Sequence, residues 1–302
     1  MAERIVTVGG PDPTRLLSNY ERNVGGTEFY VGPNATGAGD DDRNGRSEES
    51  SMATFAAAQA LCTADKCDII HFMPGHAETI SAAAGMAVTK AGISIIGHGH
   101  GTLQPTVTLD TIISADLDID AANVTFQNIN FVANFVDITA AIDINATDCT
   151  FRGCRFTEAS GKNALIWLQD AAAMASNRIT VEACQAIAID TSNTHFINFA
   201  GTGDGHRIVR NELIGDWGTM AVGGAGIVTY ILIDGNLIAN AATTVDACIN
   251  LPATTTGVVV RNLCGGGAAV VNGITATACT IAENYYQIGT SDLSGVLDPA
   301  NA

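Results

Sequence analysis

The chain has 302 residues, of which 47% are apolar and only 15% are charged, and its formal net charge is −17. This acidic balance argues against binding to nucleic acid or to anionic membranes, because both require a basic surface. No apolar run reaches the roughly 18 residues of a membrane span, and the first residues lack the apolar core of a signal peptide. We therefore expect the chain to fold in a cytoplasm.

The first 26 residues do not share the pattern of the rest of the chain. They contain the cluster Gly9-Gly-Pro-Asp-Pro13, which breaks regular structure. We expect an arm that contacts a partner or a neighbouring subunit, and a frayed terminus is the alternative. A short strand and an acidic, glycine-rich loop follow. Asp40, Asp41 and Asp42 in this loop could bind calcium, although a solvated acidic loop is the simpler interpretation.

A capping helix is predicted at about residues 52–64, with Ser50 or Ser51 as its N-cap. Stacked strands need such a cover at their first coil, where core and strand edges would otherwise be exposed. Cys62 and Cys67 do not have the spacing of a structural zinc site. Four histidines that follow could bind a metal ion, but they lack a recognised ligand spacing. These are His71, His76, His98 and His100.

One short pattern occurs seven times between Val124 and Tyr286. Each copy has an apolar residue, an apolar anchor two positions later, a special small or polar residue three positions after the anchor, and usually a final apolar residue. The anchors, spaced by 22 to 30 residues, are Phe126, Phe151, Val181, Ile208, Ile233, Val259 and Ile281. Alternation with period two indicates strands, and a repeat of this length indicates a solenoid. The pattern therefore predicts a parallel β-helix of about nine coils over residues 27–290, followed by a polar tail at 291–302.

The special positions of successive copies should lie above one another as a structural ladder. They are Cys154, Cys184, Asn211, Asn236, Asn262 and Asn284. Asparagine amides can bond from coil to coil, since each has donors and an acceptor. Strand spacing alone permits a disulfide between the two cysteines, but a reducing cytoplasm favours thiols.

Two outer columns carry opposite charges. We expect Arg152 to pair with Glu182, and Arg261 with Glu283, as devices that fix the strand register.

A few acidic and aromatic residues are candidates for an active site. Asp143 and Asp170 could stand on neighbouring coils, as could Asp190, and glycoside hydrolysis requires two such carboxylates. Solvated side chains are the simpler interpretation of all three. Trp167 and Trp217 could stack on a sugar, but burial is the more common state of such residues. We predict no catalytic site, no metal and no cofactor, with Asp143 and Asp170 as the alternative catalytic acids.

The repeat resembles right-handed β-helix proteins of the pectin-lyase-like superfamily, which includes lyases, hydrolases and non-enzymes. Further segments resemble β-helix head-decoration or fibre proteins of tailed bacteriophages, which commonly form trimers on the capsid. These segments begin at Phe29, Phe72, Val124 and Asn211 and read FYVG, FMPGHAETI, VTFQNINF and NELIGD.

This resemblance implies a non-enzymatic virion protein on the capsid exterior, assembled in the host cytoplasm. It would form a homotrimer and bind the major capsid protein, with residues 1–26 as the anchor. The alternative is a tailspike-like protein that binds or degrades a host-surface polysaccharide.

Overall fold

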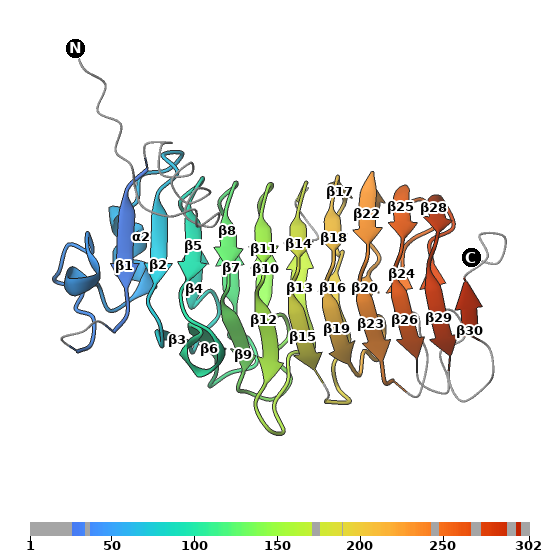
Figure 1. The fold of residues 1–302 in the computed structure, drawn as a ribbon, viewed down its shortest axis with the longest axis horizontal. Helices are drawn as coiled ribbons and strands as arrows, with labels where there is room; N and C mark the ends of the chain where they lie inside the picture. Colours follow the sequence, from blue (N-terminus) through green and yellow to red (C-terminus); the bar gives the residue numbers. More distant parts are fainter. Residues whose placement is uncertain are drawn as a thin grey trace, which may run out of the picture.

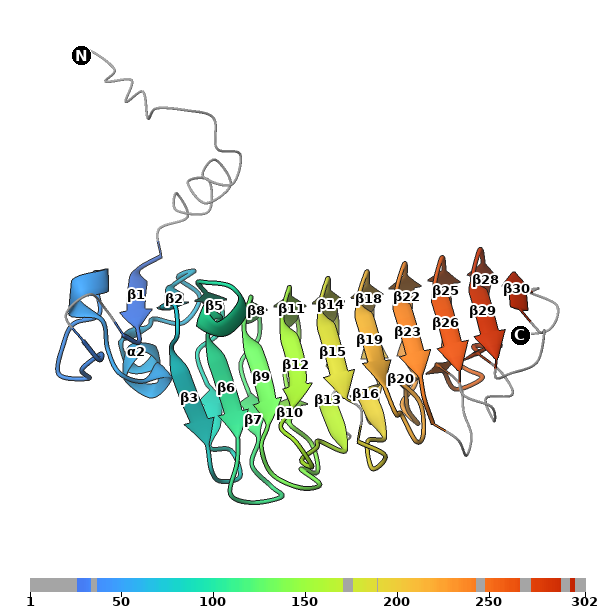
Figure 2. The same cartoon turned by 60° about the horizontal axis from the view of Figure 1, so that its bottom comes forward.

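The computed structural model describes residues 26–33, 37–170, 176–188, 190–242, 248–266, 273–288 and 294–296. These residues form a right-handed parallel β-helix, a rod in which the coils succeed one another along the long axis (Figure 1). Each full coil adds one strand to each of three sheets, in a constant order (Figure 2). The predicted fold class is therefore confirmed. Residues 1–25, which make up nearly all of the predicted arm, lie outside the described part of the chain.

Three sheets run the length of the rod. Sheet 1 is β1 (Glu28–Val31), β2 (Ile69–Phe72), β5 (Ser94–Gly97), β8 (Thr125–Gln127), β11 (Thr150–Arg152), β14 (Thr180–Glu182), β18 (Arg207–Val209), β22 (Ile231–Asp234), β25 (Gly257–Val260) and β28 (Cys279–Ala282). Sheet 2 is β3 (Ala77–Ile80), β6 (Thr106–Leu109), β9 (Asn130–Ala133), β12 (Arg155–Glu158), β15 (Gln185–Ala188), β19 (Glu212–Gly215), β23 (Leu237–Asn240), β26 (Leu263–Gly266), β29 (Tyr285–Ile288) and β30 (Ser294–Val296). Sheet 3 is β4 (Met86–Val88), β7 (Leu117–Ile119), β10 (Ile142–Ile144), β13 (Ile166–Asp170), β16 (His195–Asn198), β20 (Val222–Gly223), β24 (Ile249–Asn250) and β27 (Ile274–Thr275). A minor sheet pairs β17 (Gly203–Asp204) with β21 (Val228–Thr229).

Alternation of apolar and polar residues decides which side chains fill the rod. In β7 and β10 the outer two residues are buried and the central residue is only half-buried. Inside, like residues stack from coil to coil: the rings of Phe126 and Phe151 are 5.4 Å apart and nearly parallel. Phe131 stacks on Phe156 in the same way, at 5.3 Å. Such offset stacking adds to the stabilisation from burial alone.

A single left-handed residue makes the turn from sheet 1 to sheet 2 in seven successive coils. These residues are Asn128, Gly153, Ala183, Arg210, Gly235, Arg261 and Glu283, with φ between 52° and 66°. One residue at positive φ bends the chain sharply between the two sheets, which lets the next residue point into the rod. That next residue is the special position of the repeat.

The special position forms a hydrogen-bonded column. The Asn211 side-chain amide donates to Asn236 Oδ1 at 2.9 Å, Asn236 donates to Asn262 at 2.8 Å, and Asn262 donates to Asn284 at 2.9 Å. Each amide also donates to a main-chain carbonyl of the preceding coil; for Asn236 this is Ile208 O at 2.9 Å. Earlier in the column Cys184 directs its thiol to Phe151 O. All eight cysteines of the chain are free thiols.

The cap at the first coil differs from the prediction in its bounds. The helix is α2 (Phe55–Leu61), and its N-cap is Thr54, whose side chain accepts from Ala57 N. Met52 instead lies extended and pairs with Val31. Ser47 and Ser50 cap a separate 3₁₀ turn, η2 (Glu48–Ser50); a second such turn is η3 (Gly101–Leu103). No helix in the described ranges has the length and apolarity of a membrane span.

The outer charge columns and the end of the chain contain two more differences. Arg152 pairs with Glu182 as predicted, at 3.3 Å, but Arg261 pairs with Asp234 rather than Glu283. Asp234 is in register with Val260, the residue before Arg261, so the guanidinium reaches the aspartate diagonally across the two strands.

Within the predicted tail, residues 294–296 form β30, which pairs antiparallel with β29.

Candidate functional site

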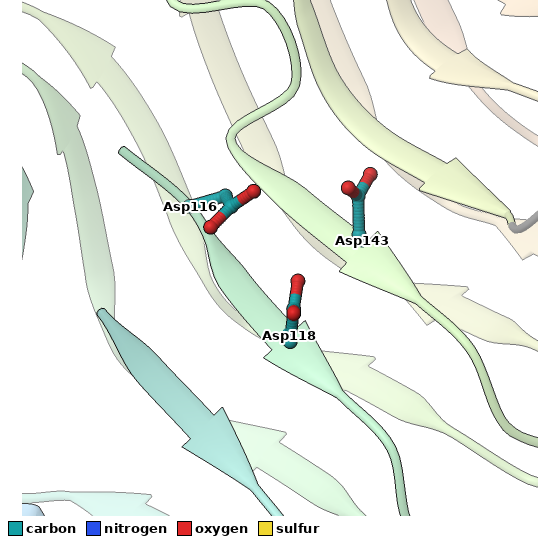
Figure 3. A group of neighbouring side chains, drawn as sticks. All are labelled: Asp116, Asp118 and Asp143. Atoms are coloured by element: carbon teal, nitrogen blue, oxygen red, sulfur yellow. The ribbon is translucent and has the colours of Figure 1, made fainter. Parts of the chain in front are cut away.

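Two neighbouring strands of sheet 3 present aspartates on the outer face of the rod. The triplets Leu117-Asp-Ile119 and Ile142-Asp-Ile144 bury their apolar residues, so each central aspartate points outward. The strands pair in parallel with Asp118 opposite Asp143. Both carboxylates therefore project from the same side of the sheet, one coil apart (Figure 3).

Asp116 completes the group. It lies two residues before Asp118, so period-two alternation places it on the same face. Its carboxylate accepts a short hydrogen bond from the main-chain N–H of Ala84, which holds it beside the coil that precedes β7. Asp116, Asp118 and Asp143 are all half-buried, and each offers one oxygen within 4.8 Å of the others (Figure 3).

Burial and mutual repulsion raise the pKa values of these carboxyls. The pKa of Asp143 is raised to about 6, by burial first and then by the neighbouring Asp116 and Asp118, while a hydrogen bond from Gln169 lowers it. The pKa of Asp118 is raised by burial first and then by Asp116 and Asp120. Burial also raises the pKa of Asp116, against the Ala84 hydrogen bond. Asp143 is thus the group that holds a proton most readily, since like charges cannot all ionise at this separation.

A row of polar side chains continues from Asp143 along sheet 3. Strand pairing places Gln169, Asn198, Asn250 and Thr275 successively in register with it, interrupted only by Gly223. Gln169 donates to Asp143 at 3.4 Å and Asn198 donates to Gln169 at 3.1 Å. This polar row, Asp118–Asp143–Gln169–Asn198–Asn250–Thr275, is a half-buried line of hydrogen-bonding groups, spaced by about 4.8 Å per strand.

Among the described residues, these three carboxylates lie close enough together to hold a metal ion. Carboxylate oxygens suit hard cations such as Ca²⁺. No lysine or arginine in the described ranges forms an ion pair with them, so their negative charge is balanced by protonation or by what the site binds.

Asp170 does not share the site with Asp143. The two residues lie on neighbouring strands, but Asp143 pairs with Gln169, and Asp170 pairs with the inward Ile144. Asp170 is 1% exposed and accepts hydrogen bonds from the main-chain N–H groups of Ala200 and Gly201. Its carboxylate therefore fixes a loop from inside the rod, and the expectation that it acts as a surface acid beside Asp143 is wrong.

The other sequence candidates also serve local structure. His71 and His98 hydrogen-bond to each other at 2.8 Å, and His76 pairs with Glu78, so three of the four histidines are held in two separate contacts. Asp41 accepts from the N–H of Ala53 and Thr54 ahead of α2, while Asp190 Oδ1 accepts from Ser192 N within its own turn. The indoles of Trp167 and Trp217 are fully buried and offer no platform to a sugar.

Asp116 and Asp118 were missed by the sequence analysis, although a signal was present. Asp118 and Asp143 are 25 residues apart and stand in near-identical triplets, which is the same spacing that identified the repeat.

No protein-family model and no curated protein sequence matches the chain. Among solved structures, pectate lyase Pel9A is similar with 16% identity and a TM-score of 0.41, over 87% of this chain and 81% of that one. The GH136 lacto-N-biosidase from Eubacterium ramulus is similar with 10% identity and a TM-score of 0.30, over 91% of this chain and 70% of that one. Likenesses at these values carry no information about the chemistry of the site.

Proposed function

We propose that this protein binds a carbohydrate chain along the polar row of sheet 3 and hydrolyses a glycosidic bond at Asp143. The observation that carries the proposal is the pair formed by Asp143, whose pKa is raised to about 6, and Asp118, its register partner on the same outer face. Cleavage of a glycosidic bond needs one protonated carboxylic acid beside one ionised carboxylate. Unequal environments separate the two roles.

In this proposal Asp143 donates its proton to the oxygen of the leaving sugar. As the bond from the anomeric carbon to the leaving oxygen breaks, the ionised Asp118 forms a glycosyl ester with that carbon, and Asp116 stabilises the developing positive charge. A water molecule that gives its proton to Asp143 then hydrolyses the ester and restores both carboxyl groups. Their oxygens lie within 4.8 Å, nearer to the ~5–5.5 Å of enzymes that form a covalent intermediate than to the ~6.5–9.5 Å that leaves room for water between the carboxyls.

The polar row supplies the binding track. Amide and hydroxyl groups hydrogen-bond to sugar hydroxyls as both donors and acceptors. They lie in line with Asp143, on strands that the stacked coils hold rigidly, so a bound chain would be positioned relative to the acid. Rigid elements of this kind position reacting groups better than loops do.

The test is incubation with a panel of neutral and acidic polysaccharides, followed by a reducing-end assay. We expect cleavage of at least one substrate without an unsaturated product, and a loss of about 10²-fold or more in Asp143→Asn. Asp120→Asn is the matched control, because this exposed aspartate is held by Asn145 at 2.9 Å one row away, and it should stay within a few-fold of the parent. Cleavage that survives in Asp143→Asn, or none on any substrate, would contradict the proposal.

A structural role in a phage virion is a second proposal, supported by one surface feature. Leu237, Leu263 and Tyr285 stand in register at the starts of three successive strands of sheet 2 and are 39%, 51% and 54% exposed. Apolar side chains aligned in this way are typical of an association surface, as a homotrimer or a contact with capsid protein would need. Light scattering on the parent and on Leu263→Glu tests it; a monomer in both at micromolar concentration counts against self-association.

A further inference from the structure

A shallow groove crosses the outer face of sheet 1, on a different face of the rod from the aspartates. It has a volume of about 200 Å³. Its lining residues are Cys67, Ile69, Ser94, Ile96, Thr125, Gln127 and Arg152. Strand register explains the set: Ile69, Ser94 and Thr125 form one outward row, and Ile96, Gln127 and Arg152 form the next. Two isoleucines thus contribute apolar surface, with hydrogen-bonding groups around them.

The polar groups of the groove are available for a ligand. Among the described residues, the side chains of Ser94, Thr125 and Gln127 have no hydrogen-bond partner, in contrast with the polar row of sheet 3, where neighbours bond to one another. Two hydroxyls and one amide offer donors and acceptors within the span of one small molecule.

Arg152 gives the groove a positive charge that its neighbours do not cancel. Its Nε donates to Glu182, but Glu182 also binds Arg210, so two guanidinium groups share one carboxylate. Other arginines in these outer columns differ: Arg178 and Arg261 each engage one aspartate through both Nε and Nη2. Only Nε of Arg152 is occupied within the described structure, so its terminal N–H groups are free. The groove therefore carries a cationic group, in a chain of net charge −17.

We propose that this groove binds a sugar acid, a single pyranose ring that carries a carboxylate. The carboxylate takes the free N–H groups of Arg152, since a guanidinium matches a carboxylate in geometry and charge. Ring C–H groups lie on Ile69 and Ile96, and ring hydroxyls bond to Ser94, Thr125 and Gln127. The small volume favours one ring, because pockets for larger ligands measure about 300 Å³ or more. The site does not depend on cleavage at Asp143.

The experiment titrates glucuronate, glucose and acetate into ¹⁵N-labelled full-length protein and maps the shifted amides. We expect glucuronate to shift amides of β2, β5 and β8, with glucose and acetate each at least about tenfold weaker, because each lacks half of the contacts. Arg152→Gln should weaken glucuronate binding by about tenfold or more. Arg261→Gln, at an outward arginine in the turn that follows β25, should leave it unchanged. Shifts confined to other faces, equal binding of glucose, or unchanged affinity in Arg152→Gln would overturn the proposal.

Cys67 provides an independent readout. It is the exposed cysteine at the rim of the groove, while seven others are buried or half-buried. Glucuronate should slow alkylation of Cys67, and an alkylated Cys67 should weaken glucuronate binding. Repeating both measurements in Asp143→Asn separates the two proposals. If this variant still binds glucuronate, the groove proposal stands whether or not the polysaccharide assay finds cleavage. If this variant no longer binds glucuronate, the ligand occupies sheet 3 instead.

Discussion

Asp118 and Asp143 are register partners on neighbouring strands of sheet 3, and their carboxylates face the same side. Placing two like charges one strand apart disfavours ionisation of both. The pair therefore retains a proton at a pH where an isolated aspartate has lost it. The pH dependence of cleavage and of the free energy of unfolding should both report this proton.

The rate of polysaccharide cleavage should depend on the proton of Asp143. Because the pKa of this carboxyl is about 6, kcat/KM should fall about tenfold per pH unit above pH 6, where the acid form is lost. At low pH, kcat/KM should fall as Asp118 becomes protonated, because this carboxylate must be ionised. In Asp118→Asn the residual activity should show its upper limb at lower pH, because one neighbouring charge is gone. If kcat/KM falls at the same high pH in the parent and in Asp118→Asn, the proton belongs to a group other than Asp143.

Asp143→Asn should stabilise the fold at neutral pH while it removes activity. The pKa of Asp143 is raised on folding, so the folded state binds more protons than the unfolded state between the ordinary value of 3.8 and about 6. The free energy of unfolding therefore falls as pH rises through this window. The rise of the Asp143 pKa from 3.8 to about 6 corresponds to ~3 kcal/mol. Because partial exposure screens this interaction, we expect Asp143→Asn to gain about 1 kcal/mol in the free energy of unfolding at pH 7. Urea unfolding at pH 7 and pH 4 checks this, since the gain should vanish at pH 4.

The asparagine column should contribute more to stability than any surface polar group. Asn236→Ala removes the acceptor for Asn211 and the donors to Asn262 and Ile208 O. Buried partners left without hydrogen bonds should cost about 2–4 kcal/mol in the free energy of unfolding. Asn250→Ala, at a half-buried outward position of sheet 3, should cost under about 0.5 kcal/mol. Equal losses in the two variants would contradict the assigned role of the column.

The fold could be predicted from the sequence because its two periods are both visible there. Alternation along each strand determines which side chains face inward. Repetition of about 25 residues along the chain determines which residues of successive coils stack on one another. The site could not be predicted fully, and Asp170 shows why. In β13 two successive residues, Trp167 and Leu168, are buried, so the alternation shifts by one and Asp170 turns inward. Its hydrogen-bond donors, Ala200 and Gly201, are some 30 residues away and leave no local signal.

Ala183→Gly should stabilise the protein at the turn between β14 and β15. Ala183 has φ of 52°, a left-handed conformation that glycine adopts without strain, and Gly153 occupies the same turn position one coil earlier with φ of 59°. We expect a gain of about 0.5–1 kcal/mol in the free energy of unfolding. Gly153→Ala is the reverse control: its Cβ would meet nothing within 4 Å, so it should lose a similar amount through backbone strain alone. If both substitutions change stability in the same direction, backbone conformation is not what governs this turn.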